Sequence, residues 1–286
     1  MVRMSWNVLI SIALAYAAVV ALVFLFQSRL VYYPEVGREV AVTPQSYGLA
    51  FETAEIRTAD GETLQAWWVP ASGARGTVLF FHGNAGNISH RLDYLLMFNR
   101  LRYSTLIVDY RGYGKSTGRP SEEGTYRDAE AAWDYLRHSR SVRPQDLVIA
   151  GESLGGAVAT WLAARVQPRA VVLHSTFSSV NDLGAGIYWF LPVRLISRIG
   201  YDNVANLGRI RSPVFVAHSR NDDIIPYSHG RKVFEAAGEP KAFLEMRGGH
   251  NDGFIFTRPE WVAQMAAFLD RHADAWEPPM NADGRR

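Results

Sequence analysis

The amino-acid sequence predicts an α/β fold in which a mostly parallel sheet has helices on both faces, preceded by an N-terminal transmembrane helix. Short, fully apolar runs recur along the chain, and segments with the helical spacing of apolar residues separate them. Such runs are typical of strands buried on both faces, as in a parallel sheet between two layers of helices. The transmembrane helix is predicted from a long uncharged stretch near the N-terminus.

The composition is that of a folded protein with little net charge. Of 286 residues, 48% are hydrophobic and 20% are charged, and 30 Lys and Arg nearly balance 28 Asp and Glu, for a net charge of +2. Disordered chains combine low hydrophobicity with high net charge, so that class is excluded. The small charge, with no run of basic residues, also argues against nucleic acid as a partner. The chain has no Cys, which excludes disulfides, a Cys nucleophile and Cys-ligated zinc.

Residues 1–29 are predicted to form a single-pass membrane anchor. No residue from 4 to 28 is charged, and Ser11 is the only polar residue in the 19-residue stretch from 8 to 26. A helix of that length spans roughly 28 Å, close to the roughly 30 Å thickness of the hydrocarbon layer of a bilayer. Trp6 and Tyr33 stand at the two ends, where interfacial aromatic residues belong.

Two other interpretations of this stretch stay open, a cleaved signal peptide and a buried core helix. No cleavage site with small residues follows Phe26, which argues against the signal peptide. Arg3 on one side of the stretch and Arg29 and Arg38 on the other nearly balance, so the sequence does not tell which side of the membrane the following domain occupies. In either orientation that domain is held close to the lipid surface.

One domain is predicted over residues 30–272, because no Pro-rich or Ser-rich linker divides them. Its first two strands are expected on either side of a turn signal at Asp60 and Gly61. From there on, apolar runs alternate with helical segments. Strands are expected at 51–57, 63–69, 78–81, 105–108, 147–150, 170–173, 214–217 and 243–246, and helices at 88–101, 122–137, 154–166, 231–237 and 259–271.

Two segments depart from this alternation. Residues 176–210 hold aromatic and aliphatic clusters where a short loop would ordinarily connect a strand to the next helix. A long insertion in this kind of sheet is typical of a lid or binding loop, so we expect a short apolar lid here. Residues 273–286, with Pro278 and Pro279, are expected to be a disordered tail.

The sharpest local motif is Gly-Glu-Ser-Leu-Gly at residues 151–155, between a predicted strand and a predicted helix. A nucleophilic Ser on a strained strand-to-helix turn needs small flanking residues, because the backbone packs tightly around it. Ser153 is therefore the candidate nucleophile. The alternative is a structural glycine turn with an incidental Ser.

A Ser hydroxyl becomes an effective nucleophile only when a base takes its proton, and that base needs an orienting acid. Of eight His, His250 lies in a glycine-containing loop after a predicted strand, where its side chain can reach across the sheet. The acid is expected after a strand between Ser and His. Asp222 and Asp223 both follow the strand at 214–217, and Asp223 could instead cap the next helix.

Acyl transfer also requires hydrogen-bond donors for the negatively charged oxygen of the intermediate. Residues 80–87 leave a core strand as a glycine-containing loop, whose backbone N–H groups are free to point at the site. The expected oxyanion hole is formed by the backbone N–H groups of Asn84 and Leu154. No metal site is predicted.

Together these motifs resemble the α/β-hydrolase superfamily, and within it the membrane-anchored serine hydrolases with an HGNAGN oxyanion loop and a GESLGG nucleophile elbow. The resemblance runs from residue 30 to about residue 269. It is carried by the segments 81–87 (FHGNAGN), 109–116 (DYRGYGKS), 151–156 (GESLGG), the segment around Asp222, and 249–252 (GHND). It implies an eight-stranded, mostly parallel sheet and the triad Ser153, Asp222 and His250. Ser219 stands where such enzymes usually have Gly, which slightly weakens the assignment of Asp222.

The expected function is hydrolysis of a carboxylic ester or thioester through an acyl-enzyme on Ser153, without a metal or cofactor. The apolar insertion and the anchor favour a hydrophobic acyl substrate at the membrane, such as a lipid or an acylated protein. Two alternatives are kept. One is an acyltransferase or peptidase that uses the same triad, and the other is a catalytically silent, membrane-tethered binding module.

Overall fold

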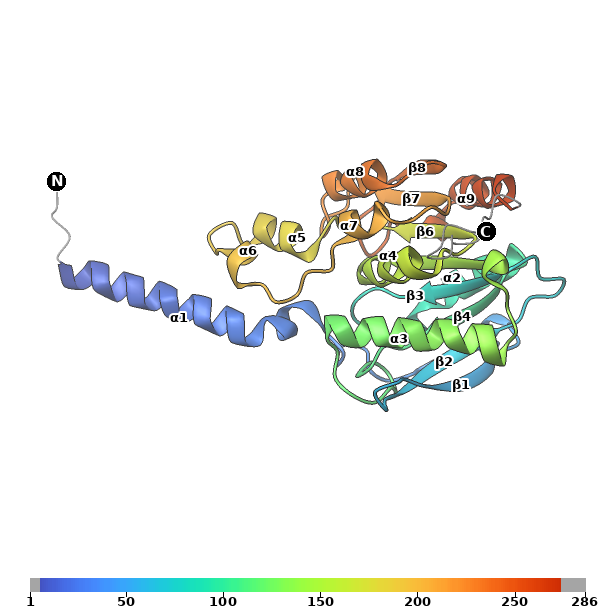
Figure 1. The fold of residues 1–286 in the computed structure, drawn as a ribbon, viewed down its shortest axis with the longest axis horizontal. Coiled ribbons are helices and arrows are strands. Elements are labelled where there is room, and N and C mark those ends of the chain that lie inside the picture. Colours follow the sequence, from blue (N-terminus) through green and yellow to red (C-terminus); the bar gives the residue numbers. More distant parts are fainter. Residues whose placement is uncertain (1–5, 274–286) are drawn as a thin grey trace, which may run out of the picture.

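An eight-stranded sheet occupies the centre of the molecule (Figure 1). The computed structural model describes residues 6–273. The strands are β1 (Glu52–Arg57), β2 (Thr63–Val69), β3 (Thr77–Phe81), β4 (Ser104–Val108), β5 (Leu147–Glu152), β6 (Ala170–His174), β7 (Val214–Ser219) and β8 (Lys241–Met246), in the order β1-β2-β4-β3-β5-β6-β7-β8. Only β2 runs in the direction opposite to the other strands of the sheet, so the predicted mostly parallel, eight-stranded sheet is confirmed.

Helices cover both faces of the sheet, as the apolar strands require. The major helices after the first are α2 (Leu92–Arg100), α3 (Glu122–Asp134), α4 (Leu154–Val166), α8 (Tyr227–Ala236) and α9 (Pro259–Arg271). Buried side chains of α3, α4 and α8 form one core cluster with one face of the sheet. Side chains of α2 and α9 form a second cluster with the other face. The strands between these layers, such as β3, β5 and β6, are buried along their whole length, which explains why they read as continuous apolar runs.

The differences from the expected elements are small and local. The helix expected at 88–101 begins as a 3₁₀ turn (Ile88–Arg91), because the Asn87 side chain caps that turn by accepting a hydrogen bond from the Ser89 N–H. The helix expected at 231–237 begins earlier, at Tyr227, directly after Pro226. The C-terminal tail expected at 273–286 lies, apart from Ala273, outside the described residues.

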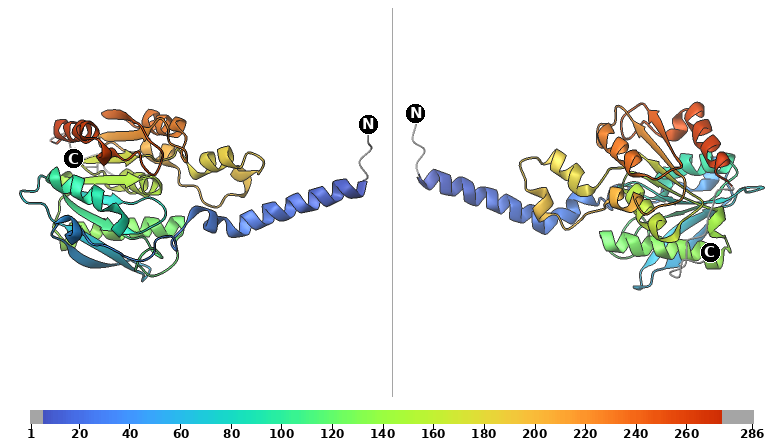
Figure 2. Two further views of the ribbon diagram at one scale, coloured as in Figure 1. Left: turned by 180° about the vertical axis from the view of Figure 1, so that it is seen from behind. Right: turned by 45° about the horizontal axis from the view of Figure 1, so that its top comes forward.

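Between β6 and β7 the chain forms three short helices, α5 (Val180–Ile187), α6 (Val193–Ile196) and α7 (Asn203–Leu207). This is the segment for which the sequence predicts an insertion. Figures 1 and 2 show α5 and α6 at the end of the molecule from which helix α1 projects. The insertion and α1 are therefore neighbours, although some 150 residues of chain separate them.

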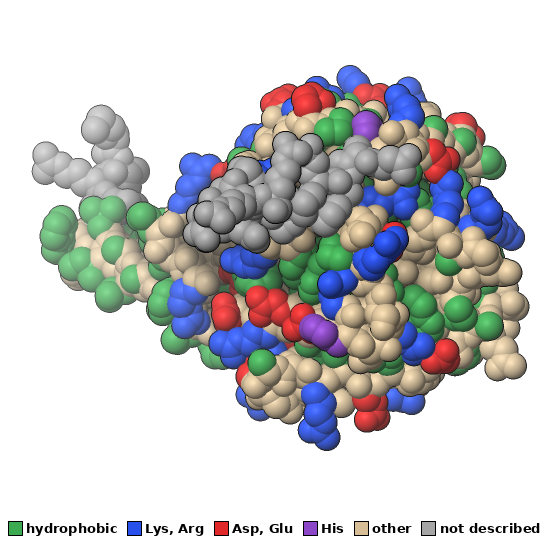
Figure 3. All heavy atoms as spheres, turned by 45° about the vertical axis from the view of Figure 1, so that its right-hand side comes forward, with side chains coloured by type: hydrophobic (Ala, Val, Ile, Leu, Met, Phe, Trp, Pro, Cys, Tyr) green, Lys and Arg blue, Asp and Glu red, His purple; other side chains and the backbone are tan. Residues whose placement is uncertain are grey.

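Helix α1 (Trp6–Val31) runs two residues beyond the predicted end of the anchor. It projects from the body, and hydrophobic side chains cover the projecting part (Figure 3). An 18-residue window of α1 has a mean hydropathy of 2.8, and none of that window is buried. By length and composition α1 is suited to cross a membrane, and a helix of this kind near an N-terminus also fits a signal sequence.

The register of the parallel strands brings their carboxyl ends to one edge of the sheet. Glu152 at the end of β5 pairs with His174 at the end of β6, and Ser219 at the end of β7 pairs with Met246 at the end of β8. The loops that follow these strands therefore converge at one place. In open α/β sheets this edge is where ligands bind.

Candidate active site

Ser153 occupies the sharp turn between β5 and α4. Its backbone has φ +52° and ψ −117°, a strained conformation for a residue other than Gly. Hydrogen bonds hold both of its backbone groups: its N–H donates to the His174 carbonyl at 2.9 Å, and its carbonyl accepts from the Thr176 hydroxyl at 2.8 Å. The turn therefore lifts the Ser153 side chain out of the sheet and fixes its direction.

The glycines of the motif are required by close approach of backbone to backbone. A Cβ atom at Gly155 would overlap the carbonyl of Phe81, which belongs to β3 and cannot move without disturbing the sheet. We expect Gly155→Ala to cost about 3 kcal/mol and to lower the apparent melting temperature in detergent by roughly 10 °C.

Gly186→Ala is the matched control for this change. Gly186 also lies in a helix, and a Cβ atom there meets nothing within 4 Å. Ala is the better helix former, so this variant is expected to melt at the same temperature or slightly higher. Equal melting temperatures for the two variants would contradict the tight packing of the turn.

Ser153, His250 and Asp222 lie in hydrogen-bonding sequence. The distance from Ser153 Oγ to His250 Nε2 is 3.1 Å, and the distance from His250 Nδ1 to Asp222 Oδ2 is 2.8 Å. Both His250 and Asp222 follow strands at the carboxyl edge, β8 and β7 respectively. The fold thus brings together three residues that are far apart in the sequence.

The Asp222 carboxylate is buried and fully engaged. Its Oδ1 atom accepts hydrogen bonds from the backbone N–H groups of Ile224, at 3.0 Å, and Ile225, at 2.7 Å, while Oδ2 faces the His250 ring. Burial alone would raise the pKa of Asp222, but the hydrogen bond and charge of His250 and these two N–H groups outweigh it and lower the pKa. Asp222 therefore stays ionised and can hold the ring with its Nδ1–H pointing inward.

Asp223 has a different place, although it adjoins Asp222. Its Oδ1 atom accepts a hydrogen bond from the backbone N–H of His250 at 2.8 Å. It does not cap the next helix, because the N-cap position of α8 is Pro226. The two candidate acids are thus separated by geometry: Asp222 contacts the imidazole ring, and Asp223 holds the loop that carries it.

Asn84 and Leu154, whose backbone N–H groups are expected to bind an oxyanion, line the same cavity as Ser153 and His250. Leu154 is the first residue of α4, where a helix leaves its N–H groups without intrahelical acceptors. Asn84 lies in the loop after β3. Within residues 6–273 neither of these two N–H groups has a hydrogen-bond acceptor.

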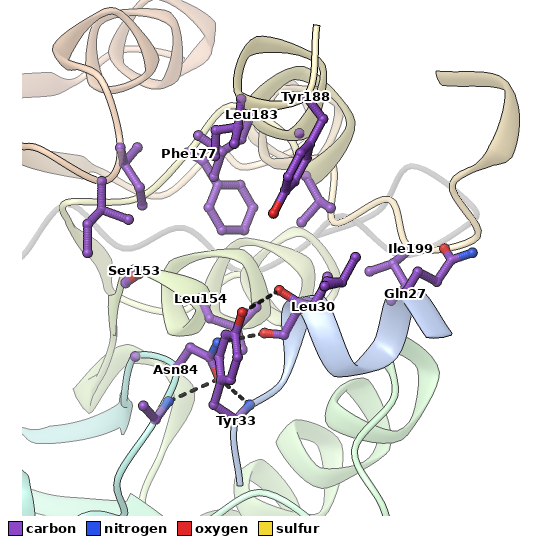
Figure 4. Close-up of a pocket in the computed structure, with 18 of the residues that line it drawn as sticks. Gln27, Leu30, Tyr33, Asn84, Ser153, Leu154, Phe177, Leu183, Tyr188 and Ile199 are labelled. Carbon is purple, nitrogen blue, oxygen red and sulfur yellow. Dashed lines mark hydrogen bonds between the residues drawn. The ribbon is translucent and has the colours of Figure 1, made fainter. Parts of the chain in front are cut away.

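The Asn84 side chain joins this loop to the end of α1, a role that sequence reasoning missed. Its Oδ1 accepts from the Tyr33 N–H at 3.1 Å (Figure 4). Its Nδ2 donates to the Val31 carbonyl at 2.6 Å, and the Tyr113 hydroxyl also donates to Oδ1, at 2.6 Å. The backbone that carries the Asn84 N–H is therefore positioned by the residues that leave the apolar helix.

A buried ion pair lies beside Ser153 and was also missed from the sequence. Arg91 Nε contacts Glu152 Oε2 at 2.6 Å, and the Gly83 N–H points to the same oxygen at 3.4 Å. Burial raises the pKa of Glu152, but the charge of Arg91 opposes it and keeps the pKa below its usual value. These contacts connect Glu152, the residue before Ser153 in the motif, to the segment that follows β3.

His174, the last residue of β6, lies buried behind the Ser153 turn. Its Nε2–H faces the Gly253 carbonyl at 3.4 Å, and the Tyr94 hydroxyl contacts Nδ1. Burial lowers the pKa of His174 to about 4, although the nearby Glu152 carboxylate partly opposes this effect. His174 is thus a neutral structural histidine at physiological pH.

The buried, neutral state of His174 predicts a loss of stability in mild acid. The unfolded chain binds a proton at this residue near pH 6.5, whereas the folded chain binds it only near pH 4. Stability is therefore complete above pH 6.5 and falls by about 3 kcal/mol between pH 6.5 and pH 4. Thermal melts across this range should show a flatter pH dependence for His174→Gln than for wild type. His138→Gln, a change at an exposed histidine, should leave the wild-type slope, and a wild-type slope in His174→Gln would contradict the prediction.

Ser153 and His250 border a cavity of about 490 Å³, within the range of about 300–1,000 Å³ typical of ligand sites. Its floor carries the polar groups, and its sides are mostly aliphatic and aromatic. These sides come from three places: the insertion (Phe177, Val180, Leu183, Ile187, Tyr188, Leu191, Val193, Ile196, Ile199), the end of α1 (Val23, Leu30, Val31) and the loop after β7 (Ile224, Ile225). In Figure 4, Phe177, Leu183 and Tyr188 lie on the opposite side of the cavity from Leu30 and Tyr33.

The described residues form no candidate metal site. Among them, no group of three or more His, Asp or Glu side chains is arranged to hold a metal ion. The acid and base groups at the cavity are paired with one another, as given above.

Comparison with known proteins places this geometry in a family. A family model described as "alpha/beta hydrolase fold" matches residues 76–196. The uncharacterized protein Rv2307c of Mycobacterium tuberculosis is 37% identical over 244 residues, which cover 84% of this chain and 86% of that protein. The Arabidopsis thaliana alpha/beta hydrolase domain-containing protein WAV2 is 31% identical over 280 residues, covering 89% of this chain and 91% of WAV2.

A solved structure agrees with the family match at the level of the fold. The structure of the Pyrococcus furiosus esterase Pf2001 superposes with a TM-score of 0.69 at 20% sequence identity, covering 81% of this chain and 94% of that one. By its sequence relatives and its fold, this chain belongs to the α/β-hydrolase family.

Proposed function

We propose that this protein is a membrane-anchored serine hydrolase that cleaves carboxylic ester or thioester bonds of hydrophobic acyl substrates. The observation that carries the proposal is the sequence of contacts from Ser153 Oγ through the His250 ring to Asp222, at 3.1 and 2.8 Å, at the floor of an apolar cavity. A structural or binding role would require none of these three residues in this arrangement. We therefore assign Ser153 as nucleophile, His250 as base and Asp222 as the orienting acid.

The first half-reaction forms an acyl-enzyme. As Ser153 Oγ attacks the acyl carbonyl carbon, His250 Nε2 takes the hydroxyl proton, and the carbonyl oxygen becomes an oxyanion. The backbone N–H groups of Asn84 and Leu154 donate to that oxygen, each lowering the barrier by about 3 kcal/mol. When the intermediate collapses, the bond to the leaving group breaks, and His250 gives its proton to the departing alcohol or thiol.

The second half-reaction returns the enzyme to its starting state. A water molecule loses a proton to His250 Nε2 and attacks the acyl carbon, the Ser153 ester bond breaks, and His250 returns the proton to Ser153 Oγ. The products are the free acid and a regenerated site. Asp222 keeps its charge throughout and stabilises the protonated ring.

The membrane part of the proposal rests on α1. The helix is 26 residues long, uncharged until Arg29, and not buried against the body except at Gln27. We assign residues 1–29 as the anchor, 30–272 as the hydrolase domain and 176–210 as its apolar lid. A cleaved signal peptide is the competing role for the same helix, and N-terminal sequencing of the membrane-bound protein separates the two.

The proposed activity is tested with the full chain in detergent and a series of nitrophenyl esters from acetyl to palmitoyl. We expect turnover that increases with chain length to an optimum, because the cavity is lined mainly by apolar side chains. Turnover that does not improve beyond acetyl would contradict the hydrophobic acyl substrate. Absence of turnover on every ester, together with absence of labelling by a fluorophosphonate, would favour the silent binding module instead.

A second experiment separates hydrolysis from the alternatives on the same triad. Product release is compared in water alone, with an added alcohol or amine, and with nitroanilides in place of esters. A hydrolase delivers most of the acyl group to water under all conditions. Transfer mainly to the added alcohol or amine would indicate an acyltransferase, and faster cleavage of the amides would indicate a peptidase.

A further inference from the structure

The end of α1 is hydrogen-bonded to the insertion through Gln27, which differs from the rest of the helix in being buried. Gln27 is buried, whereas the rest of α1 is partly or fully exposed. Its Oε1 atom accepts a hydrogen bond from the Arg198 N–H at 2.6 Å, and its Nε2 donates to the carbonyls of Phe24, at 2.9 Å, and Ile196, at 3.3 Å. The Arg198 guanidinium also donates to the Phe24 carbonyl at 3.0 Å and lies over the Phe24 ring.

A second contact joins the insertion to α1 much farther along the helix. The Tyr16 hydroxyl donates to the Phe190 carbonyl at 2.8 Å. Tyr16 precedes Gln27 by 11 residues, which is about 16 Å of helix. The edge of the insertion from Phe190 to Arg198 therefore follows α1 from Tyr16 to Gln27.

Tyr16 lies at the middle of the uncharged stretch 4–28. If this stretch spans a bilayer, its middle lies within the hydrocarbon layer, and the part of the insertion bound to Tyr16 lies there too. A free backbone carbonyl is costly in hydrocarbon. The Tyr16 hydroxyl satisfies the Phe190 carbonyl, so this contact suits a lipid environment.

The side chains at the tip of the insertion have the character that such a position requires. Outside α1, exposed large apolar side chains are concentrated here: Ile187 and Phe190 are half exposed, and Trp189 and Leu195 are 82% and 87% exposed. The charged residue among them, Arg194, turns back to pair with Asp182 of α5 at 2.8 Å. Contiguous apolar surface of this kind marks contact with a membrane or a partner, and its attachment to α1 favours the membrane.

We propose that α1 and the tip of the insertion, residues 187–195, lie together in the bilayer, and that the cavity above Ser153 receives the acyl chain of a membrane lipid directly from the hydrocarbon layer. The inference deepens and rests on the proposed hydrolase function. Val23, Leu30 and Val31 of α1 form one side of the cavity, and Ile187, Tyr188, Leu191 and Ile196 form the side facing them. An acyl chain entering between these two elements reaches Ser153 without leaving an apolar environment, so its transfer through water is avoided.

The placement of the tip is tested without any measurement of catalysis. The chain has no Cys, so Trp189→Cys provides a single attachment site for a nitroxide spin label in phosphatidylcholine proteoliposomes. The control is Arg143→Cys, an exposed position before the amino end of β5 and so at the opposite edge of the sheet from Ser153. We expect the label at 189 to be accessible to oxygen and protected from a water-soluble nickel chelate, and the label at 143 to show the reverse. Equal exposure of both labels to nickel would overturn the proposal.

The route of the substrate is tested with a charge at the tip. Trp189→Asp does not alter a residue that lines the cavity, but an acid is unfavourable in hydrocarbon. We expect Trp189→Asp to reduce hydrolysis of a phosphatidylcholine or diacylglycerol ester in proteoliposomes at least tenfold. The same variant should hydrolyse a soluble nitrophenyl ester in detergent at the wild-type rate. Trp189→Leu, the apolar control, should retain both activities. Equal rates of Trp189→Asp and wild type on the lipid would overturn the membrane route. Absence of activity on every ester in wild type would count against the proposed function alone, because the spin-label result does not depend on catalysis.

Discussion

Replacing Ser153 by Ala is expected to reduce ester hydrolysis at least a thousandfold. The change removes the oxygen that would form the acyl-enzyme, and its neighbours His250 and Asp222 then have no hydroxyl to act on. Residual turnover would come only from substrate binding and the oxyanion donors. Initial rates on the best nitrophenyl ester, compared at equal concentrations of folded protein, measure the effect.

Covalent labelling provides the second readout for this variant. A fluorophosphonate should modify wild type at Ser153 and fail to modify Ser153→Ala, with the site located by mass spectrometry of the labelled peptide. Ser46→Ala, at an exposed position outside the cavity, controls for handling and should keep full activity. Retention of more than a tenth of the activity by Ser153→Ala, or a label on another residue, would refute the assignment of the nucleophile.

Asp222→Asn is expected to lower kcat by roughly 10⁴, close to the effect of losing the corresponding acid in other triads. The Asn amide would donate to His250 Nδ1, forcing the ring proton onto Nε2, where it can no longer accept the Ser153 proton. The backbone N–H groups of Ile224 and Ile225 can still bond to the Asn side-chain oxygen, so the loop should keep its shape. The loss should therefore appear in kcat with little change in melting temperature.

Asp223→Asn is the matched control, one residue away on the same loop. Asp223 accepts from the backbone N–H of His250, and an Asn oxygen can accept the same hydrogen bond. We expect a loss of less than about tenfold, since the ring and its tautomer are unaffected. A larger loss for Asp223→Asn than for Asp222→Asn would reverse the roles assigned to the two acids.

Most of the fold could be predicted because its signals are local in the sequence. Strands such as β3 and β5 are buried on both faces, so their burial appears directly as a continuous apolar run. The turn at Ser153 could be predicted for the same reason: the close approach that demands Gly151 is to the backbone of Gly155 and Gly156, within the motif itself. The α5, α6 and α7 helices were not predicted individually, because helices of four to eight residues are too short to show a period.

What escaped prediction depends on contacts between distant residues. The residues alone leave both Asp222 and Asp223 as candidates, and the choice of Asp222 comes from the resemblance; in the structure the turn at Ile224 and Ile225 orients the Asp222 carboxylate toward the ring. Glu152 pairs with Arg91, which is 61 residues away. The sequence around either residue therefore does not indicate the ion pair. The same is true of Gln27, the buried polar residue of an apolar helix, whose partners are Ile196 and Arg198.

The hydrogen bonds between Asn84 and the residues that follow α1 have a consequence for where this protein can be active. Val31 and Tyr33 help to position the loop that carries one oxyanion donor, and Val23 and Leu30 enclose the cavity. A protease that cut the chain after Tyr33 would remove these supports along with the anchor. If α1 is the membrane anchor proposed above, such a cut would release a body with an open cavity and a loosened loop. Detachment from the membrane and loss of activity would then be one event.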